Sequence, residues 1–149
     1  MNTPCQYACF KFLPTLAYVH LRVTPNPDLG DEIPGDVEQQ VKWRDNATEA
    51  LEHLFQWLTK VKKVRRILKL IVEDNDLFPC GEASIRNCLG ALDDIRYLDW
   101  KRPNISIETL KKAKQVVELW LYSTGINAVL SGWADEGGLQ TLKTVGQAR

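Results

Sequence analysis

The sequence predicts an α/β fold in which short strands alternate with short helices and pair in parallel. Its second half holds three strand-like segments, and a short helix-like segment follows each of them. The three segments are Ile67–Asp74, Ile95–Trp100 and Val116–Tyr122. Strands that alternate with helices in this way are typical of parallel α/β folds. Residues 67–145 are therefore expected to form a strand–helix repeat array.

The hydrophobic frame within these segments recurs at a regular interval. The I-x-x-L-x-W frame of Ile95, Leu98 and Trp100 returns as V-x-x-L-x-L from Val116, and more weakly as L-x-x-L from Leu139. Together with the first segment, successive starts lie 28, 21 and 23 residues apart. Leucine-rich repeats are roughly 20–29 residues long. The spacing predicts a leucine-rich-repeat-like array, and the short crossovers favour it over the alternative, a small flavodoxin-like parallel sheet.

Length and charge narrow the class of protein. A chain of 149 residues is about one domain, so residues 1–149 are expected to form a single α/β domain. Nineteen basic and nineteen acidic side chains cancel. The cations of residues 60–69 are interpreted as a solvated face, because no nucleic-acid-binding motif accompanies them. The sequence therefore predicts no nucleic-acid partner.

The N-terminus and the cysteines bear on location and cofactors. The first 23 residues lack both a basic opening and a long apolar core, so they predict neither a signal peptide nor a membrane span. We expect a cytoplasmic protein with no membrane partner. The four cysteines form no C-x-x-C pair and are accompanied by only two histidines, which argues against a zinc site. We expect free thiols, no bound metal and no cofactor.

The N-terminal third contributes a strand, a loop and a long helix. Leu16–Val23 alternates apolar and polar side chains, as a half-buried strand does. Residues 24–35 hold three prolines and two glycines, which predict an exposed loop. Residues 36–60 carry apolar side chains near helical spacing, and Asp36 is the expected N-cap of this helix.

The repeat array follows. Ile67–Val72 is apolar apart from one lysine, which is typical of a central strand covered on both faces. Pro103 ends the second strand, and Ser106 is the expected N-cap of a helix of about two turns. Val116–Leu121 forms the third strand. Ala128–Trp133 forms a last short helix, which ends at the two glycines that follow.

Parts of this array also resemble a region of known proteins. The segments are Arg65–Asp74 (R-R-I-L-K-L-I-V-E-D), Tyr97–Leu110 (Y-L-D-W-K-R-P-N-I-S-I-E-T-L), Val117–Trp133 (V-E-L-W-L-Y-S-T-G-I-N-A-V-L-S-G-W) and Gly138–Leu142 (G-L-Q-T-L). From about residue 12 to the C-terminus, the chain resembles an uncharacterised region of fungal multidomain proteins that precedes a subtilisin-like protease domain. The resemblance implies a region that is accessory to such a protease.

The resemblance does not extend to catalysis. A subtilisin-like protease needs an Asp, a His and a Ser in separate sequence contexts. His20 is expected in a strand and His53 on a helix, and the sequence contains no G-x-S-x-G nucleophile motif. We therefore expect no catalytic residues in this chain.

A ligand pocket at the carboxyl ends of the strands is one candidate site. Clustered carboxylates at this edge of a parallel sheet can hold Mg²⁺ beside a phosphate group. The residues expected there are Glu73, Asp74, Asp76, Lys101, Arg102, Ser123 and Thr124. Polar residues are also common at strand ends because turns require them, and the sequence has no phosphate-binding glycine loop. A domain that binds magnesium and phosphate is therefore the alternative function.

A partner-binding surface is the other candidate site. Five side chains alternate with the apolar frame of the second and third strands, namely Tyr97, Asp99, Glu118, Trp120 and Tyr122. Exposed aromatic residues dominate the energetics of protein interfaces, whereas in a sheet covered on both faces the same residues would form a second core layer. The sequence leaves both interpretations open. We expect a non-catalytic protein-interaction or regulatory module with a protein partner.

Overall fold

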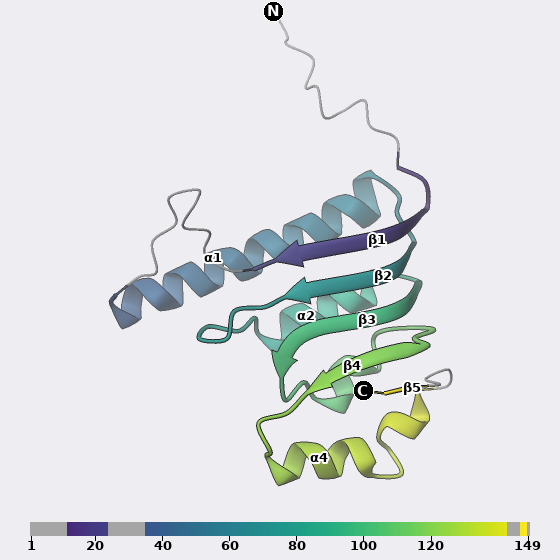
Figure 1. Ribbon diagram of the computed structural model, residues 1–149. Coiled ribbons are helices and arrows are strands. Elements are labelled where there is room, and N and C mark those ends of the chain that lie inside the picture. The colour runs from purple at the N-terminus through teal and green to yellow at the C-terminus, as the bar shows by residue number, and fades with distance from the viewer. Residues whose placement is uncertain (1–11, 24–34, 143–146, 149) are drawn as a thin grey trace, which may run out of the picture.

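A parallel sheet and the helices that connect its strands make up the fold (Figure 1). The structure is a computed structural model that describes residues 12–23, 35–142 and 147–148. The strands are β1 (Thr15–Arg22), β2 (Arg66–Glu73), β3 (Asp94–Pro103), β4 (Glu118–Tyr122) and β5 (Gln147–Ala148). Each strand pairs in parallel with the next one along the chain. The predicted α/β class is confirmed.

Helices connect the strands. They are α1 (Val37–Gln56), which runs on into the π-helical turn η3 (Trp57–Val61), α2 (Glu82–Gly90), α3 (Ile107–Leu110), α4 (Asn127–Ala134) and the 3-10 turn η4 (Leu139–Thr141). The two predicted N-caps are confirmed, because the side chain of Asp36 accepts from the backbone of α1 and that of Ser106 accepts from the backbone of α3. No helix within the described segments is both long and apolar enough to cross a membrane.

The apolar frame aligns across the strands. The strand register joins Leu16, Ile67 and Ile95 in one row, Val19, Leu70, Leu98 and Leu119 in a second, and Leu21, Val72 and Trp100 in a third. The frame residues of β2 and β3 are at most 1% exposed. Buried side chains of α1 and α2, among them Phe55 and Ile85, belong to the same core. Burial of these rows supplies the main driving force for folding.

The helices leave one face of the sheet open. In Figure 1, α1 and α2 lie behind the sheet, and the strands are seen from the other side. The expectation that β2 is covered on both faces is therefore wrong. Ile67, Leu70 and Val72 are 0% exposed, but Ile71 and Glu73 between and beyond them are only half-buried. The apolar run of β2 led to the wrong prediction of cover on both faces, because Ile71 is apolar but does not belong to the core.

Two further expectations of the repeat array need correction. Helix α3 has four residues instead of two turns, because the chain turns away after Leu110 and reaches φ 65° at Gln115. The frame at Leu139 lies in η4 and not in a strand, and the next strand, β5, lies beyond residue 145. The strand order follows the chain, so the described strands lack the order reversal of a doubly wound, flavodoxin-like sheet. The predicted loop of residues 24–35 lies outside the described residues except for residue 35.

Candidate functional site

The open face of the sheet is defined as the face that α1 and α2 do not cover. Its residues alternate with the apolar frame and are Tyr18, His20, Arg22, Lys69, Ile71, Glu73, Tyr97, Asp99, Lys101, Glu118, Trp120 and Tyr122. The five residues predicted to bind a partner are all among them. Parallel pairing sets Tyr97 beside Glu118 and Asp99 beside Trp120, so these predicted residues lie together.

Aromatic and acidic side chains pair on β3 and β4. The hydroxyl of Tyr122 donates to Asp99 Oδ1 at 2.8 Å, and the indole nitrogen of Trp120 donates to Glu118 Oε1 at 3.2 Å. Burial, and next the hydrogen bond to Asp99, raise the pKa of Tyr122 to about 12. Tyr122 therefore stays a hydrogen-bond donor at neutral pH. Trp120 and Tyr122 are half-buried, whereas Asp99 is only 6% exposed.

Basic side chains of β1 and β3 gather around a single carboxylate on β2. Glu73 lies 2.9 Å from His20 Nε2, 3.5 Å from Arg22 Nε and 3.7 Å from Lys101 Nζ. The hydrogen bond with His20 is the main reason why the pKa of Glu73 is lowered, against the opposing effect of burial. The ammonium of Lys69 lies 4.4 Å from the centre of the Tyr97 ring. We call His20, Arg22 and Lys101 the basic cluster, and Lys69 lies apart from it in the row of Tyr18 and Tyr97.

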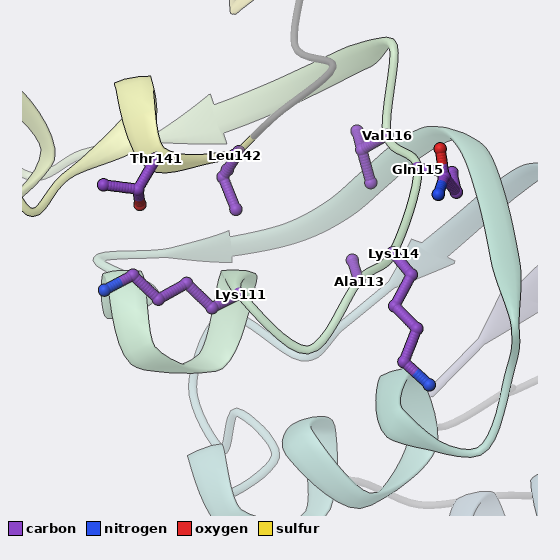
Figure 2. A pocket seen from close by; sticks show the side chains of 7 residues that line it. All are labelled: Lys111, Ala113, Lys114, Gln115, Val116, Thr141 and Leu142. Atoms are coloured by element: carbon purple, nitrogen blue, oxygen red, sulfur yellow. The ribbon is translucent and has the colours of Figure 1, made fainter.

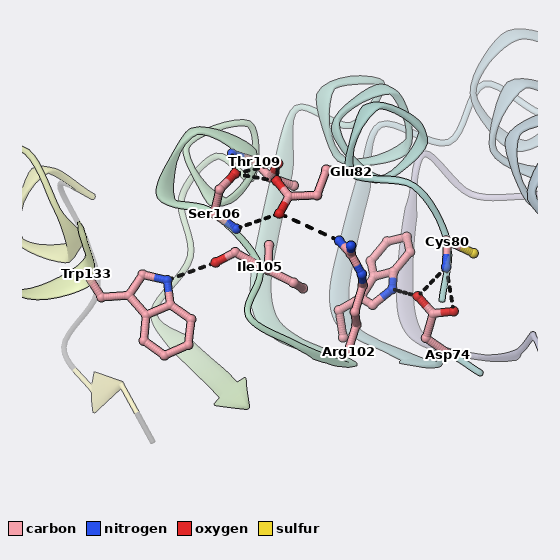
Figure 3. A network of polar contacts seen from close by, with 9 residues as sticks. Asp74, Cys80, Glu82, Arg102, Ile105, Ser106, Thr109 and Trp133 are labelled. Atoms are coloured by element: carbon pink, nitrogen blue, oxygen red, sulfur yellow. Dashed lines mark hydrogen bonds and ion pairs between the residues drawn. The ribbon is translucent and has the colours of Figure 1, made fainter. Parts of the chain in front are cut away.

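The three carboxylates of the predicted ligand pocket do not converge. Glu73 lies on the open face, but the next residue, Asp74, is 5% exposed and accepts from the backbone N–H of Cys80 at 3.0 Å (Figure 3). Its other oxygen accepts from the indole of Trp100, also at 3.0 Å. Asp76 is exposed. Within the described residues, no three His, Cys, Asp or Glu side chains are grouped so that they could hold a metal ion.

Arg102 takes part in a second polar network on the helix side. Its guanidinium lies 3.7 Å from Glu82 Oε1, and Glu82 also accepts hydrogen bonds from Ser106 and Thr109 (Figure 3). Burial raises the pKa of Glu82, but the hydrogen bonds from Ser106 and Thr109 together lower it below the usual value. Lys101, one residue earlier, faces Glu73 on the open face. The two predicted cations therefore serve different sides of the sheet.

Ser123 and Thr124, the last two residues of the predicted ligand pocket, form hydrogen bonds that stabilise the turns after β3 and β4. Thr124 Oγ1 accepts from the Asn104 amide at 2.7 Å, and the Thr124 N–H donates back to Asn104 Oδ1 at 3.1 Å. Ser123 Oγ accepts from the N–H of Gly125, which has a φ of 84°. These bonds link the chain segments after β3 and β4. They account for the polar residues at this edge through backbone requirements.

Two cavities lie away from both predicted sites. One, of about 380 Å³, lies between the α3–β4 connection and η4 and includes Lys111, Lys114 and Leu142 in its lining (Figure 2). The other, of about 320 Å³, lies between β1 and α1 beside Trp43 and Leu54. No residue of the predicted ligand pocket or partner surface lines either cavity.

The described cysteines are buried free thiols. Cys80 and Cys88 are each 1% exposed. Burial raises the pKa of both thiols to about 12. A thiol with such a pKa is protonated at neutral pH and is a poor nucleophile. These two cysteines therefore fit a structural role.

Sequence reasoning missed the half of the open face on β1 and β2. Tyr18, His20 and Arg22 alternate within the segment that was predicted as a strand, and that alternation was the available signal. The sequence did not indicate that β1 pairs with β2. This pairing brings His20 beside Ile71 and Arg22 beside Glu73. A comparison of the chain with protein-family models, with curated proteins and with solved structures finds no match.

Proposed function

We propose that this chain is a non-catalytic protein-interaction or regulatory module that binds its partner through the open face. The observation that carries the proposal is the one-sided cover of the sheet by α1 and α2. The uncovered side presents aromatic rings next to charged groups, as at Trp120 and Glu118 or at Tyr97 and Lys69. Aromatic residues are enriched in protein interfaces, and Trp and Tyr are common among the residues that contribute most to binding.

A leucine-rich-repeat-like architecture is part of the proposal. Its support is the alignment of the apolar frame in rows across β1 to β4, together with a strand order that follows the chain. In such arrays each unit contacts its neighbours, and the stacked strands form an extended binding surface. The open face corresponds to that surface.

An accessory role beside a subtilisin-like protease domain is the biological context that we propose. It rests on the resemblance of residues 12–149 to the region that precedes such domains. The polar groups of the described chain support a binding role over catalysis, since Asp74, Arg102 and Thr124 are used in internal hydrogen bonds or ion pairs.

The test compares two tryptophan variants in partner capture. Trp120 lies on the open face, whereas Trp57 lies in η3 and is 37% exposed. Immobilised wild type, Trp120→Ala and Trp57→Ala are incubated with cell lysate, and the captured proteins are quantified by mass spectrometry. Loss of an interface tryptophan costs about 2 kcal/mol or more, so we expect the specific captures to fall roughly 30-fold with Trp120→Ala and to persist with Trp57→Ala.

The result is read only if both variants fold, which far-UV circular dichroism checks. Equal capture by wild type and Trp120→Ala would contradict the proposed binding surface. Loss of capture with both variants would point to a surface elsewhere or to a general effect on the fold, and would also count against the open face.

A further inference from the structure

We propose that two copies of this chain form a symmetric dimer, in which the β1 strands pair with each other and the α1 helices pack side by side. The surface consists of the outer edge of β1 and of one side of α1 and the start of η3. The apolar residues on that side of the helix are called the α1 stripe, namely Trp43, Ala47, Ala50, Leu54 and Trp57. The inference goes beyond the proposed function, because it uses a different surface from the one around Trp120.

The outer edge of β1 is built like a strand that pairs. Within the described residues only β2 pairs with β1. The N–H of Val23 donates to the carbonyl of Glu73 on β2 at 2.8 Å. Backbone N–H and C=O groups alternate between the two edges of a strand, so those of Tyr18, His20 and Arg22 face away from β2. Natural edge strands are often protected by Lys, by Pro or by a short length, but β1 has eight residues and contains neither Lys nor Pro.

The apolar rows of the core are incomplete at β1. Leu16, Val19 and Leu21 lie in the three rows, but they are only half-buried. Their neighbours in the same rows on β2 are 0% exposed. A further strand beside β1, with its own helix, would cover the exposed part of these side chains. Burial of that apolar surface would stabilise the complex.

The α1 stripe lies beside this edge. Its residues are four, three, four and three positions apart, which places them on one side of the helix. Ala50 and Leu54 line the cavity of about 320 Å³ together with Leu21 of β1, whereas Gln56 lies on the side of α1 that faces α2. No residue of the stripe is fully buried, and Trp57 is 37% exposed. The stripe is therefore an apolar surface that continues the edge of β1 into the helix layer.

The ends of the stripe coincide with the ends of β1. Phe12, before the start of β1, lies 5.8 Å from Trp57 between ring centres. Val23, after the end of β1, lines the same cavity as Trp43. The helix therefore runs beside the strand in the opposite direction (Figure 1), and Ala50 in the middle of the stripe lies beside the middle of β1. One two-fold axis can pass through both.

A second copy covers both parts of this surface at once. A strand from another protein would pair with the edge of β1 but would leave the α1 stripe exposed. In a two-fold dimer the same patch of each copy meets itself, so β1 pairs antiparallel with β1, and the two α1 helices lie antiparallel on the same side of one continuous sheet. With the axis at Ala50, each Ala47 meets the Leu54 of the other copy. Small and large side chains then lie opposite one another near the axis, which allows close helix packing.

The size and charge of the patch also suit a dimer. A strand of eight residues is about 26 Å long. The sheet layer and the helix layer are each roughly 10 Å thick, so the patch covers about 500 Å² on each copy, or about 1,000 Å² in total, which is the lower limit for a specific interface. The formal net charge of the chain is zero, so two copies do not repel each other. The α1 stripe itself holds no charged residue.

The experiment is sedimentation velocity of the full chain at concentrations up to roughly 200 μM, because interfaces near the lower size limit bind in the micromolar range. Ala50→Glu places two carboxylates at the axis, and Glu is well tolerated at an exposed helix position. Tyr18→Pro removes an N–H that faces the outer edge of β1 and no hydrogen bond to β2. The control Gln56→Glu adds the same charge as Ala50→Glu, at an exposed position that faces α2.

We expect the wild type and Gln56→Glu to move from the mass of one chain to that of two as the concentration rises. Ala50→Glu and Tyr18→Pro should each weaken the dimer about tenfold or more, because like charges or a missing N–H oppose the contact. Circular dichroism verifies the fold, and Tyr18→Lys replaces Tyr18→Pro if that variant is not folded, since Lys protects natural edge strands. A wild type that stays monomeric throughout would overturn the inference. So would a dimer that either Ala50→Glu or the Tyr18 variant leaves unchanged.

A further variant separates this inference from the proposed function. Trp120→Ala should form the dimer like the wild type, because Trp120 lies on β4, which is not a neighbour of β1 in the sheet. A monomeric wild type would overturn the dimer and leave the binding role of the open face intact. A dimer that is lost with Trp120→Ala but kept with Ala50→Glu would overturn the inference and place the contact between copies on the open face.

Discussion

Replacement of Asp74 by alanine is predicted to be among the most destabilising single changes in the described chain. Asp74 is 5% exposed and accepts from the Cys80 N–H at 3.0 Å and from the Trp100 indole at 3.0 Å. Both donors belong to residues that are 1% exposed. The alanine side chain accepts no hydrogen bond, and the buried position of the donors limits their access to water.

The magnitude follows from the Cys80 and Trp100 donors, which are the most deeply buried of the three that lose their acceptor. The third is the N–H of Asn75, which donates to Asp74 Oδ1 at 2.8 Å in a residue that is 9% exposed. A buried donor left without a partner costs about 1–3 kcal/mol, so the pair predicts a loss of roughly 2–6 kcal/mol in the free energy of unfolding. For a domain of this size each kcal/mol lowers the melting temperature by about 2–4 °C. The value in the middle of this range, about 4 kcal/mol, predicts a decrease of roughly 10 °C.

Urea denaturation followed by tryptophan fluorescence measures the change in free energy. Asp76→Ala is the matched control, because Asp76 is an exposed aspartate two residues away, and its cost should stay within about 0.5 kcal/mol. Trp100→Phe removes the indole donor, so Asp74→Ala should cost less in that background than in the wild type. A cost below about 1 kcal/mol for Asp74→Ala in the wild type would refute the reasoning.

Three further predictions concern other parts of the fold. The folded-state pKa of Glu82 lies below the usual value of 4.5, so the ionised carboxylate stabilises the fold above that pH. Glu82→Gln should therefore lower the free energy of unfolding most at neutral pH. Urea titrations should show that the difference in free energy between the variant and the wild type becomes smaller as the pH falls below 4.5. At pH 8, Cys80 and Cys88 should resist alkylation by iodoacetamide in the folded chain and react after denaturation, as site-resolved peptide mass spectrometry would measure, because burial raises their pKa to about 12. A Cβ at Gly138 would lie 2.3 Å from a backbone oxygen of α4, whereas a Cβ at Gly137 would have open space. Gly138→Ala should therefore lower the melting temperature clearly more than Gly137→Ala. Equal melting temperatures for the two variants would contradict the close packing at this turn.

Local signals in the sequence predicted the elements better than their packing. The N-caps at Asp36 and Ser106 depend on residues within one turn, and both are correct. The cover of β2 does not depend on local residues. Ile71 is apolar and lies within an apolar run, yet it is on the open face, because α1 and α2 both pack on the opposite side. The length of α3 likewise depends on where the chain must turn to reach β4.

The two candidate sites differ in how far the sequence could specify them. The partner surface was predicted from alternation along β3 and β4, and alternation fixes the face of each side chain once the strand exists. The ligand pocket was predicted from proximity in sequence, which does not fix the face. Asp74 immediately follows Glu73, and Arg102 immediately follows Lys101, but the members of each pair lie on opposite sides of the sheet.

These neighbouring residues instead form cross-strand pairs on each side. Glu73 meets Lys101 on the open face, and on the helix side Asp74 holds the indole of Trp100 while Arg102 meets Glu82. Because the strands are parallel and in register, the same alternation repeats at each strand end. A cluster of charges at consecutive positions is therefore divided between the two faces, and only every second residue can contribute to one site. The charges on the open face are those of the cations Arg22, Lys69 and Lys101 and of the carboxylates Glu73, Asp99 and Glu118, so the two signs balance there.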